Sequence, residues 1–287
     1  MDKAGCACRL RLCTRTARMD IDSLVHASES CPRLFLDGGS NTGEHVEAFL
    51  KGSFHRCALS SPNRLYGRAW KNASTSQRKR WMQPLAEPST FCVRSFDAAP
   101  GFAQRLQSSR PIKPGVPSVS AWPSNVRFVD AALGTVTGPA LPRTIIKYSN
   151  DTWGLTSTTF SHRDIHAGRP PLLEEFVTHG PGVDVRQLVR RYRSSSPTIA
   201  LKLDIEGGEF GVLDALADAP DVLCSISYLF VEYHNLKFNL TKYGFRGDAY
   251  HHIGDRIHHA MDSVPDCKLR SECHDSRSFP LVPSPKS

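Results

Sequence analysis

The sequence predicts an α/β fold with a mostly parallel sheet that helices cover on both faces. Five short runs are almost continuously apolar, and each is followed by polar or helical sequence, as in parallel strands buried on both sides. A carboxylate falls at or next to the carboxyl end of every run. The runs are 34–36, 91–96, 126–129, 198–203 and 226–233, and their acids are Asp37, Asp97, Asp130, Asp204 and Glu232.

The composition is that of a chain able to bury a large core. It has 287 residues, of which 40% are hydrophobic, and no apolar run approaches the roughly 18 residues of a membrane span. The net charge of +8 would suit an acidic partner or nucleic acid. However, the basic residues are spread along the chain rather than gathered in one block, which favours a solvated basic surface over a nucleic-acid site.

We expect residues 1–30 to be disordered and residues 31–287 to form a single domain with insertions at about 53–89 and 135–183. The first insertion is predicted to be solvated; the alternative is an arm that contacts the acceptor or nucleic acid. The second is long and polar, and it could supply a lid or an acceptor pocket from Asn150, Trp153, Ser157, Thr158 and Thr159.

One helix is predicted just after the second insertion. Asp184 has the place of an N-cap, and four apolar or aromatic residues follow at helical spacing and would face inward: Val185, Leu188, Val189 and Tyr192.

The nine cysteines include no C-x-x-C pair, so we expect no zinc framework. A Cys267–Cys273 disulfide is possible if the chain is exported. Asn72, Asn150 and Asn239 begin N-glycosylation triplets, which matter only if the chain enters a secretory lumen. The compartment stays open: cytoplasm by default, with a secretory lumen or an organelle as alternatives.

The stretch from residue 34 to residue 50 predicts a strand, a glycine-rich turn and a helix from about Glu44 to Leu50, which Gly52 would end. It lacks both the G-x-G-x-x-G and the P-loop spacing. A carboxylate directly before the turn, at Asp37, would repel a pyrophosphate but suit the cationic amino and sulfonium end of S-adenosylmethionine. The pattern Asp-x-Gly-x-Asn-x-Gly, at Asp37, Gly39, Asn41 and Gly43, resembles motif I of class I methyltransferases.

Two further acids extend this predicted cofactor site. Asp97 ends the second run and is placed to accept hydrogen bonds from ribose hydroxyls. Asp130 could bind an adenine amino group, with the backbone N–H of Ala131 reading a ring nitrogen. For either acid the competing interpretation is a helix N-cap or a turn.

A second signature lies in residues 201–213. Its Lys-x-Asp-x-Glu-Gly-x-Glu pattern, at Lys202, Asp204, Glu206 and Glu209, resembles the FkbM-type methyltransferase family. The resemblance spans about residues 34–240, interrupted by the insertions. It implies a Rossmann-like class I methyltransferase fold, S-adenosylmethionine as methyl donor, and an oxygen acceptor such as a sugar or polyketide hydroxyl. Family members often carry Glu where this chain has Asp97.

The chemistry implied by this family needs a base to take the acceptor's proton. We expect Asp204 and Glu206 to line the reaction centre and His234 to be the leading base candidate. A divalent metal held by the carboxylates stays open, as does a purely capping role for Glu206 and Glu209. The histidine pairs at 251–252 and 258–259 are better explained by a solvated helix face.

The sequence therefore predicts an S-adenosylmethionine-dependent methyltransferase that acts on oxygen in a sugar, glycan or small molecule. The alternative is a non-catalytic binding or scaffold protein with the same fold, which could contact nucleic acid through its basic insertion.

Overall fold

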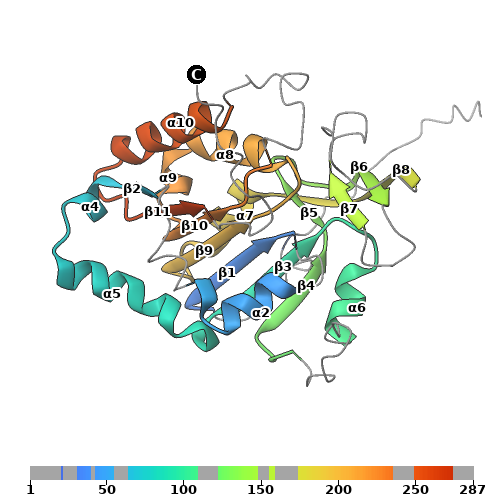
Figure 1. Cartoon of the computed structure of the whole chain (residues 1–287), viewed down its shortest axis with the longest axis horizontal. Helices are drawn as coiled ribbons and strands as arrows, with labels where there is room; N and C mark the ends of the chain where they lie inside the picture. The colour runs from blue at the N-terminus through green and yellow to red at the C-terminus, as the bar shows by residue number, and fades with distance from the viewer. Residues whose placement is uncertain are drawn as a thin grey trace, which may run out of the picture.

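A computed structural model describes residues 31–39, 43–54, 64–108, 122–147, 155–158, 174–234 and 249–273, together with Ile21. Within these ranges the chain is an α/β protein built on a seven-stranded, mostly parallel sheet with helices packed against it (Figure 1). None of the described helices combines the length and the apolar composition that crossing a bilayer requires. Of residues 1–30, which were predicted to be disordered, Ile21 packs against the core and the others lie outside the described residues.

The main sheet has the strand order β2-β11-β10-β9-β1-β3-β4. Six of its strands pair in parallel, and taken in chain order they are arranged 3-2-1-4-5-6, the order of a doubly wound Rossmann-like sheet. They are β1 (Arg33–Gly38), β3 (Cys92–Asp97), β4 (Val126–Asp130), β9 (Thr198–Leu203), β10 (Tyr228–Val231) and β11 (Arg270–Cys273). The edge strand β2 (Arg64–Tyr66) runs antiparallel to β11. All five predicted strands are therefore confirmed, with an acid at or just after each carboxyl end.

Both faces of the sheet are buried, because side chains alternate between two hydrophobic clusters along each strand. In β1, Leu34 and Leu36 pack into one cluster and Phe35 into the other. Helices α7 (Val185–Tyr192), α8 (Glu209–Ala217), α9 (Pro220–Leu223) and α10 (Ala249–Ser263) cover the first face. Helices α2 (Glu44–Leu50), α4 (Arg68–Lys71), α5 (Thr75–Ala86) and α6 (Phe102–Ser108) cover the second.

Two helices that the sequence predicted form as expected. The structure confirms α2 over Glu44–Leu50, followed by Gly52 with a φ of 73°. Helix α7 begins after Asp184, whose side chain accepts a hydrogen bond from the Arg186 N–H. Its four predicted inward residues are all buried. Local signals were sufficient here, because a cap and an apolar stripe lie within one short segment.

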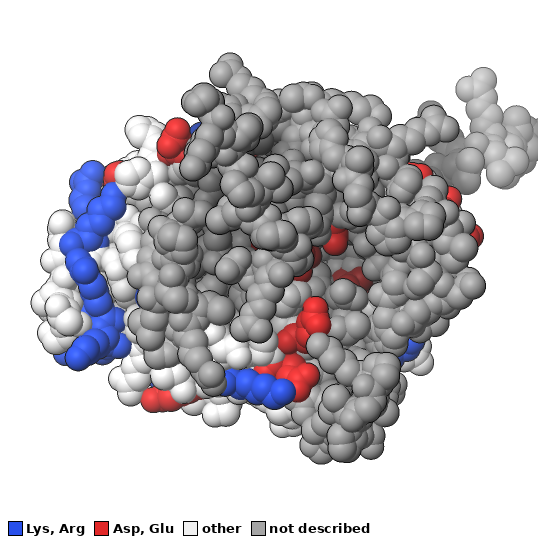
Figure 2. All heavy atoms as spheres, in the orientation of Figure 1, with Lys and Arg blue, Asp and Glu red and all other residues white. Residues whose placement is uncertain are grey.

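The first insertion is not simply solvated, so that prediction is wrong for its inner face. Together with the 3-10 turn Pro88–Thr90, it supplies β2, α4 and α5, and it buries Trp70, Met82 and Leu85 in the core. Its outer face is exposed and basic, and Lys and Arg side chains gather on the side formed by α4 and α5 (Figure 2). One segment thus carries both a core face and a charged face.

The second insertion forms a second sheet. Strands β5 (Ala132–Gly134), β8 (Glu174–Asp184), β6 (Gly138–Lys147) and β7 (Leu155–Thr158) lie in that order, and only β5 and β8 pair in parallel. Of the residues proposed for a lid or pocket, Ser157 and Thr158 belong to β7. Asn150, Trp153 and Thr159 lie outside the described residues.

Two disulfides join distant parts of the chain. Cys31 pairs with Cys92, which ties the start of β1 to the start of β3, and Cys224 pairs with Cys267. The second pair contradicts the suggested Cys267–Cys273 bridge, because the partner of Cys267 comes from the end of α9. The disulfides close loops with sequence separations of 61 and 43, and chain entropy alone makes each worth about 4 kcal/mol.

The glycine turn after β1 is shaped by contact with β9. Gly39 has a φ of 93°, and its N–H donates a hydrogen bond of 2.9 Å to the Phe96 carbonyl. A Cβ atom at Gly39 would lie 1.8 Å from the carbonyl oxygen of Asp204. The Asp204 N–H in turn donates to the Gly38 carbonyl at 3.0 Å. The glycine is therefore required because two strand ends touch, a reason that the sequence pattern does not reveal.

We predict that Gly39→Ala lowers the free energy of unfolding by at least about 3 kcal/mol, since it combines backbone strain with a clash against backbone. Gly101→Ala is the matched control. Gly101 also has a positive φ, 76°, but a Cβ there would meet nothing within 4 Å, so we expect a loss of about 1 kcal/mol. Urea denaturation measures both, and equal losses would contradict the role given to the β1–β9 contact.

Candidate functional site

The candidate site lies where the strand order of the main sheet reverses. The chain passes from β1 to β3 and β4 on one side and then returns to β9 on the other side of β1. Ligands of open α/β sheets bind outside the carboxyl ends of the strands at such a point. Asp37, the next-to-last residue of β1, and Asp204 and Glu232, which directly follow β9 and β10, supply charges at this edge of the sheet.

The centre of the site is Lys202, a fully buried cation on β9. Its Nζ lies 3.0 Å from Asp204 Oδ2 and 3.5 Å from Asp37 Oδ1, and both Lys202 and Asp37 have no exposed surface. Burial opposes the charge of Lys202, but Asp204 and Asp37 outweigh it and raise the pKa of the ammonium. Lys202 therefore stays charged and links the carboxyl ends of β1 and β9.

Asp37 has a different role from the one the sequence suggested. Its Oδ2 accepts a 2.5 Å hydrogen bond from the Ser95 hydroxyl on β3, and its Oδ1 faces Lys202. Burial raises the pKa of Asp37, and Lys202 and Ser95 oppose this rise only in part. Since the side chain is sealed from solvent, the prediction that it clamps the cationic end of a ligand is wrong. It is an internal partner of Lys202.

His45, in the first turn of α2, completes the surroundings of Lys202. Its Nδ1 lies 2.8 Å from Lys202 Nζ, and its Nε2 faces Asp204 Oδ2 at 3.6 Å. Because a charged lysine can only donate, Nδ1 must be the acceptor, which places the imidazole proton on Nε2, toward Asp204. This histidine directly follows Glu44, and no spacing rule in the sequence marked it.

A second buried pair, Glu209 and His234, stands beside Asp204. Glu209 Oε1 accepts hydrogen bonds from the backbone N–H of His234 at 2.8 Å and from its Nδ1 at 3.1 Å. Glu209 Oε2 accepts from the Gly207 N–H at 2.8 Å. Glu209 thus ties the start of α8 to the segment after β10 and fixes the orientation of the imidazole, which is more than the capping role considered for it.

The other imidazole nitrogen of His234 points at three carboxylates. Nε2 lies 3.4 Å from Asp204 Oδ1, 3.7 Å from Glu206 Oε2 and 3.8 Å from Glu232 Oε1. Glu206 is the one non-glycine residue with a positive φ, 50°, among those the structure describes, and such strain is often retained at functional sites. The predicted trio of Asp204, Glu206 and His234 is therefore brought together.

The charges of this cluster fix the resting protonation of His234. Burial alone would lower its pKa, but Glu209, Glu206 and Asp204 raise it to about 9. Burial also opposes ionisation of Asp204, yet Lys202, His45 and His234 hold its pKa far below the usual range. At neutral pH, His234 is consequently an imidazolium beside an ionised Asp204, so it can act as a base only after it loses its proton.

Two overlapping sets of side chains combine one imidazole with two carboxylates, which are donor types found in sites for divalent transition metals. One set is His45, Asp204 and Glu232, and the other is Asp204, Glu206 and His234; the donor atoms in each lie within 4.8 Å of one another. Asp204 belongs to both, so a cation at either place would compete with Lys202 for it.

The residues predicted to hold ribose and adenine are present at the ends of β3 and β4 but already have partners. Asp97 and Asp130 pair in register, and both are partly exposed. Asp97 Oδ1 accepts from the Ala99 N–H at 2.7 Å, and Asp130 Oδ1 accepts from the Ala103 N–H in the first turn of α6 at 2.8 Å. One oxygen of Asp97 and one oxygen of Asp130 therefore bind backbone N–H groups, as the competing interpretation of a turn or a helix N-cap predicted.

The contact expected of Ala131 is contradicted by the structure. Ala131 is fully buried, and its N–H donates to the Val129 carbonyl at 2.8 Å, so it is not presented to a ring nitrogen. Gly43 precedes α2 with a φ of 76° and packs close to the Trp122 ring. Asn41 lies outside the described residues.

Arg143 is a neighbour of the two acids that the sequence did not reveal. It extends from β6 in the second sheet and donates to the carbonyls of Ala98 and, at 2.7 Å, Pro181. Burial lowers the pKa of its guanidinium, while Asp97 and Asp130 oppose this effect. The sequence around Arg143 does not predict its place beside Asp97 and Asp130, because this place depends on how the two sheets meet.

Comparison of the chain with models of protein families, with curated proteins and with solved structures finds no match in any of the three. The arrangement of the charged residues is thus the ground on which a function can be proposed.

We predict that Lys202→Met lowers the free energy of unfolding by about 3–5 kcal/mol at pH 7, because it leaves buried carboxylates without their cation. Adding Asp37→Asn should restore part of this loss. The control is Lys51→Met, which removes an exposed lysine that directly follows α2 and pairs with Glu47 of that helix; it should cost no more than about 0.5 kcal/mol. Urea denaturation distinguishes the variants; a Lys202→Met protein as stable as the native one would contradict the assignment.

We also predict that His234 makes the stability depend on pH. Its pKa rises from the usual 6.5 to about 9 on folding, so its contribution is complete below pH 6.5 and is lost as the pH rises through about 9. The shift corresponds to about 3 kcal/mol. His234→Gln should flatten the decline in melting temperature between pH 6.5 and 9. His252→Gln, at an exposed histidine of α10, should leave that decline unchanged.

Proposed function

We propose that this chain is an S-adenosylmethionine-dependent methyltransferase of the class I fold that transfers a methyl group to a hydroxyl of a sugar, glycan or small molecule. The observation that carries the proposal is an excess of carboxylates over cations at the point where the strand order reverses. The resemblance of residues 202–209 to the FkbM-type pattern supports the same conclusion.

The charge balance of the site favours a cationic ligand. Four carboxylates have an oxygen within 3.1–3.8 Å of a His234 ring nitrogen: Asp204, Glu206, Glu209 and Glu232. The imidazolium supplies one positive charge, and Lys202 divides its charge between Asp204 and Asp37. The remaining negative potential would attract a sulfonium and an amino group and would repel a pyrophosphate. The residues present therefore fit the donor proposed.

The ends of β3 and β4 can serve the nucleoside part of such a ligand. Asp97 and Asp130 each use an oxygen to bind a backbone N–H, but a carboxylate has about four acceptor positions. Both side chains are partly exposed. Asp97 is thus able to accept from ribose hydroxyls and Asp130 from an adenine amino group, without the help of Ala131.

Each residue of the cluster has a task in the proposed reaction. S-adenosylmethionine, when bound, supplies an electrophilic methyl group. His234 would accept the proton of the acceptor hydroxyl at Nε2, while Glu209 holds Nδ1 and keeps the ring in place. The pKa of His234 falls when another cation binds nearby, which brings the base toward its neutral form. Asp204 and Glu206 would orient the acceptor hydroxyl.

A second function is supported by the interactions that the fold makes for itself. Asp37 is sealed by Lys202 and Ser95, and the Ala131 N–H is donated to Val129. Two of the contacts expected for the cofactor are therefore used internally. A non-catalytic binding protein with this fold would show the same features, so binding of S-adenosylmethionine and its turnover are the properties that distinguish the two functions.

We predict that S-adenosylmethionine binds to the native chain and that S-adenosylhomocysteine, which lacks the sulfonium charge, binds several-fold more weakly. Glu206→Gln should reduce this preference, since it removes one negative charge from a partly exposed position. Asp97→Ala should weaken both ligands by about tenfold, as the loss of hydrogen bonds to a charged group predicts. Isothermal calorimetry measures all three effects.

Asp221→Asn is the control for these variants, because Asp221 is exposed and pairs with Arg193, which directly follows α7, away from the carboxyl ends of the strands. An acceptor screen across sugars and polyketides, scored by release of S-adenosylhomocysteine, then tests turnover. If the native chain does not bind S-adenosylmethionine, the methyltransferase proposal is wrong, and the non-catalytic binding function remains.

A further inference from the structure

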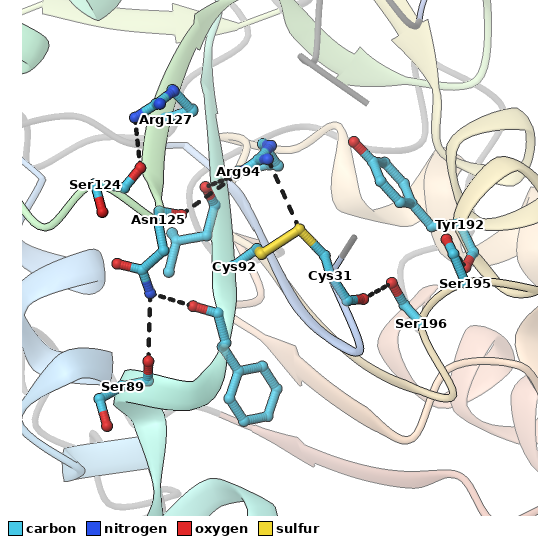
Figure 3. Close-up of a disulfide and its surroundings, with 12 residues drawn as sticks. Cys31, Ser89, Cys92, Arg94, Ser124, Asn125, Arg127, Tyr192, Ser195 and Ser196 are labelled. Atoms are coloured by element: carbon cyan, nitrogen blue, oxygen red, sulfur yellow. Dashed lines mark hydrogen bonds between the residues drawn. A yellow bond between two sulfur atoms is a disulfide. The ribbon is translucent and has the colours of Figure 1, made fainter. Parts of the chain in front are cut away.

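Two disulfides lie in the framework of the main sheet. Figure 3 shows the Cys31–Cys92 bridge joining the segments that begin β1 and β3, with Arg94 and Ser196 beside it. The Cys31 carbonyl accepts from the Ser196 hydroxyl, and Arg94 Nη2 lies 3.9 Å from Cys31 Sγ. Cys224 and Cys267 form the second bridge, and Cys31 and Cys267 are both buried.

The positions of these cysteines favour disulfides over free thiols. Each pair is far apart in the sequence, yet the Cα atoms lie 5.7 Å and 4.8 Å apart, within the range that a disulfide spans. Two such pairs come from four cysteines on four different segments of one sheet framework. Disulfides of this structural kind persist in oxidising compartments and are rare in the cytosol.

An independent feature points to the same compartment. Asn72-Ala73-Ser74 is an N-glycosylation triplet, and it forms the connection between α4 and α5. Asn72 is exposed and ends α4, while Ser74 is the N-cap of α5, its Oγ accepting from the Gln77 N–H at 3.2 Å. The other two triplets, at Asn150 and Asn239, lie outside the described residues.

We propose that this chain folds in an oxidising secretory lumen, where Cys31–Cys92 and Cys224–Cys267 form and Asn72 receives an N-linked glycan. This inference does not depend on the proposed enzymatic function. It rests on two features of the chain, the paired cysteines and the exposed acceptor triplet, that use different chemistry and different residues.

The secretory lumen supplies the reactants that both modifications need, an oxidant for the disulfides and an oligosaccharide donor for the glycan. Each disulfide forms when two thiols lose two protons and two electrons to a thiol–disulfide oxidant. At Asn72, Nδ2 forms a bond to the anomeric carbon of a lipid-diphosphate-linked oligosaccharide. The bond from that carbon to the diphosphate breaks, the lipid diphosphate leaves, and Nδ2 releases one proton.

A glycan at Asn72 would project from the basic side of the molecule and leave the candidate site open. Helix α4 lies on the opposite side of the molecule from the second sheet, toward which the carboxyl ends of the central strands point (Figure 1). The exposed Lys79 and Arg80 follow on α5. The glycan would therefore extend beside this basic face, which disfavours the alternative that the insertion contacts nucleic acid.

The glycan is tested on the full chain secreted from cultured eukaryotic cells behind a cleavable leader, with Asn150 and Asn239 replaced by Gln. Enzymatic release of N-glycans in heavy-oxygen water should convert Asn72 to labelled aspartate, detected by peptide mass spectrometry. Ser74→Thr should keep the glycan. Ser74→Asp should remove it while preserving the helix cap, because aspartate is a good N-cap that cannot complete the triplet. An unmodified Asn72 in a folded, secreted chain would overturn this part of the proposal.

The disulfides are tested by comparing chain made in the lumen with chain made in a reducing cytosol. After alkylation without reduction, the lumenal product should yield linked peptides for Cys31–Cys92 and Cys224–Cys267. It should also melt at a temperature at least about 10 °C higher than the cytosolic product with free thiols, if each bridge contributes as loop entropy predicts. Equal melting temperatures, or peptides in which these cysteines are alkylated, would overturn the inference, whatever the outcome of ligand binding.

Discussion

The interaction on which the rest of the structure depends is the buried contact of Lys202 with Asp37 and Asp204. It joins the carboxyl ends of β1 and β9, the two strands between which the order of the sheet reverses. An ammonium without exposed surface is tolerated only when carboxylates compensate it, and here they belong to different strands. The pairing therefore fixes the relative position of the two strand ends and, with them, the Gly39 turn that packs against the Asp204 backbone.

From this contact follows the electrostatic character of the candidate site. Lys202 forms ion pairs with Asp37 and with one oxygen of Asp204, while the other oxygen of Asp204 faces His234. Glu209 holds that imidazole from its far side, and Glu206 and Glu232 approach from the solvent side. One lysine and one imidazolium cannot neutralise this many carboxylates. The fold thus retains negative potential at these strand ends, and this potential would attract the proposed cationic ligand.

The sequence was sufficient for five strands of the main sheet, the order of their acids and the helices α2 and α7, because each depends on residues within one short segment. The sequence also predicted Asp204, Glu206 and His234 in one site, and the structure places them together, since the carboxyl ends of parallel strands meet at one edge of a sheet. It was wrong about Asp37, and it did not foresee Arg143 or the partner of Cys267. Those depend on contacts between segments 40 to 170 residues apart, and a local pattern contains no information on whether a carboxylate is sealed by a lysine or open to a ligand.

A chain with a net charge of +8 can still hold an acidic site, because its exposed cations and the carboxylates of the site act in different surroundings. On the α4–α5 side, water and neighbouring groups moderate the cations: Lys71 lies 3.5 Å from Asp262, and Arg78 donates to the carbonyls of Trp70 and Lys71. Exposed charges are screened beyond about 10 Å at moderate salt, so this surface contributes little potential at the strand ends. Within the site, burial weakens that screening, and the nearest carboxylates dominate. The overall basicity of the chain is therefore a property of its surface, and it does not predict the charge of the ligand that the site would bind.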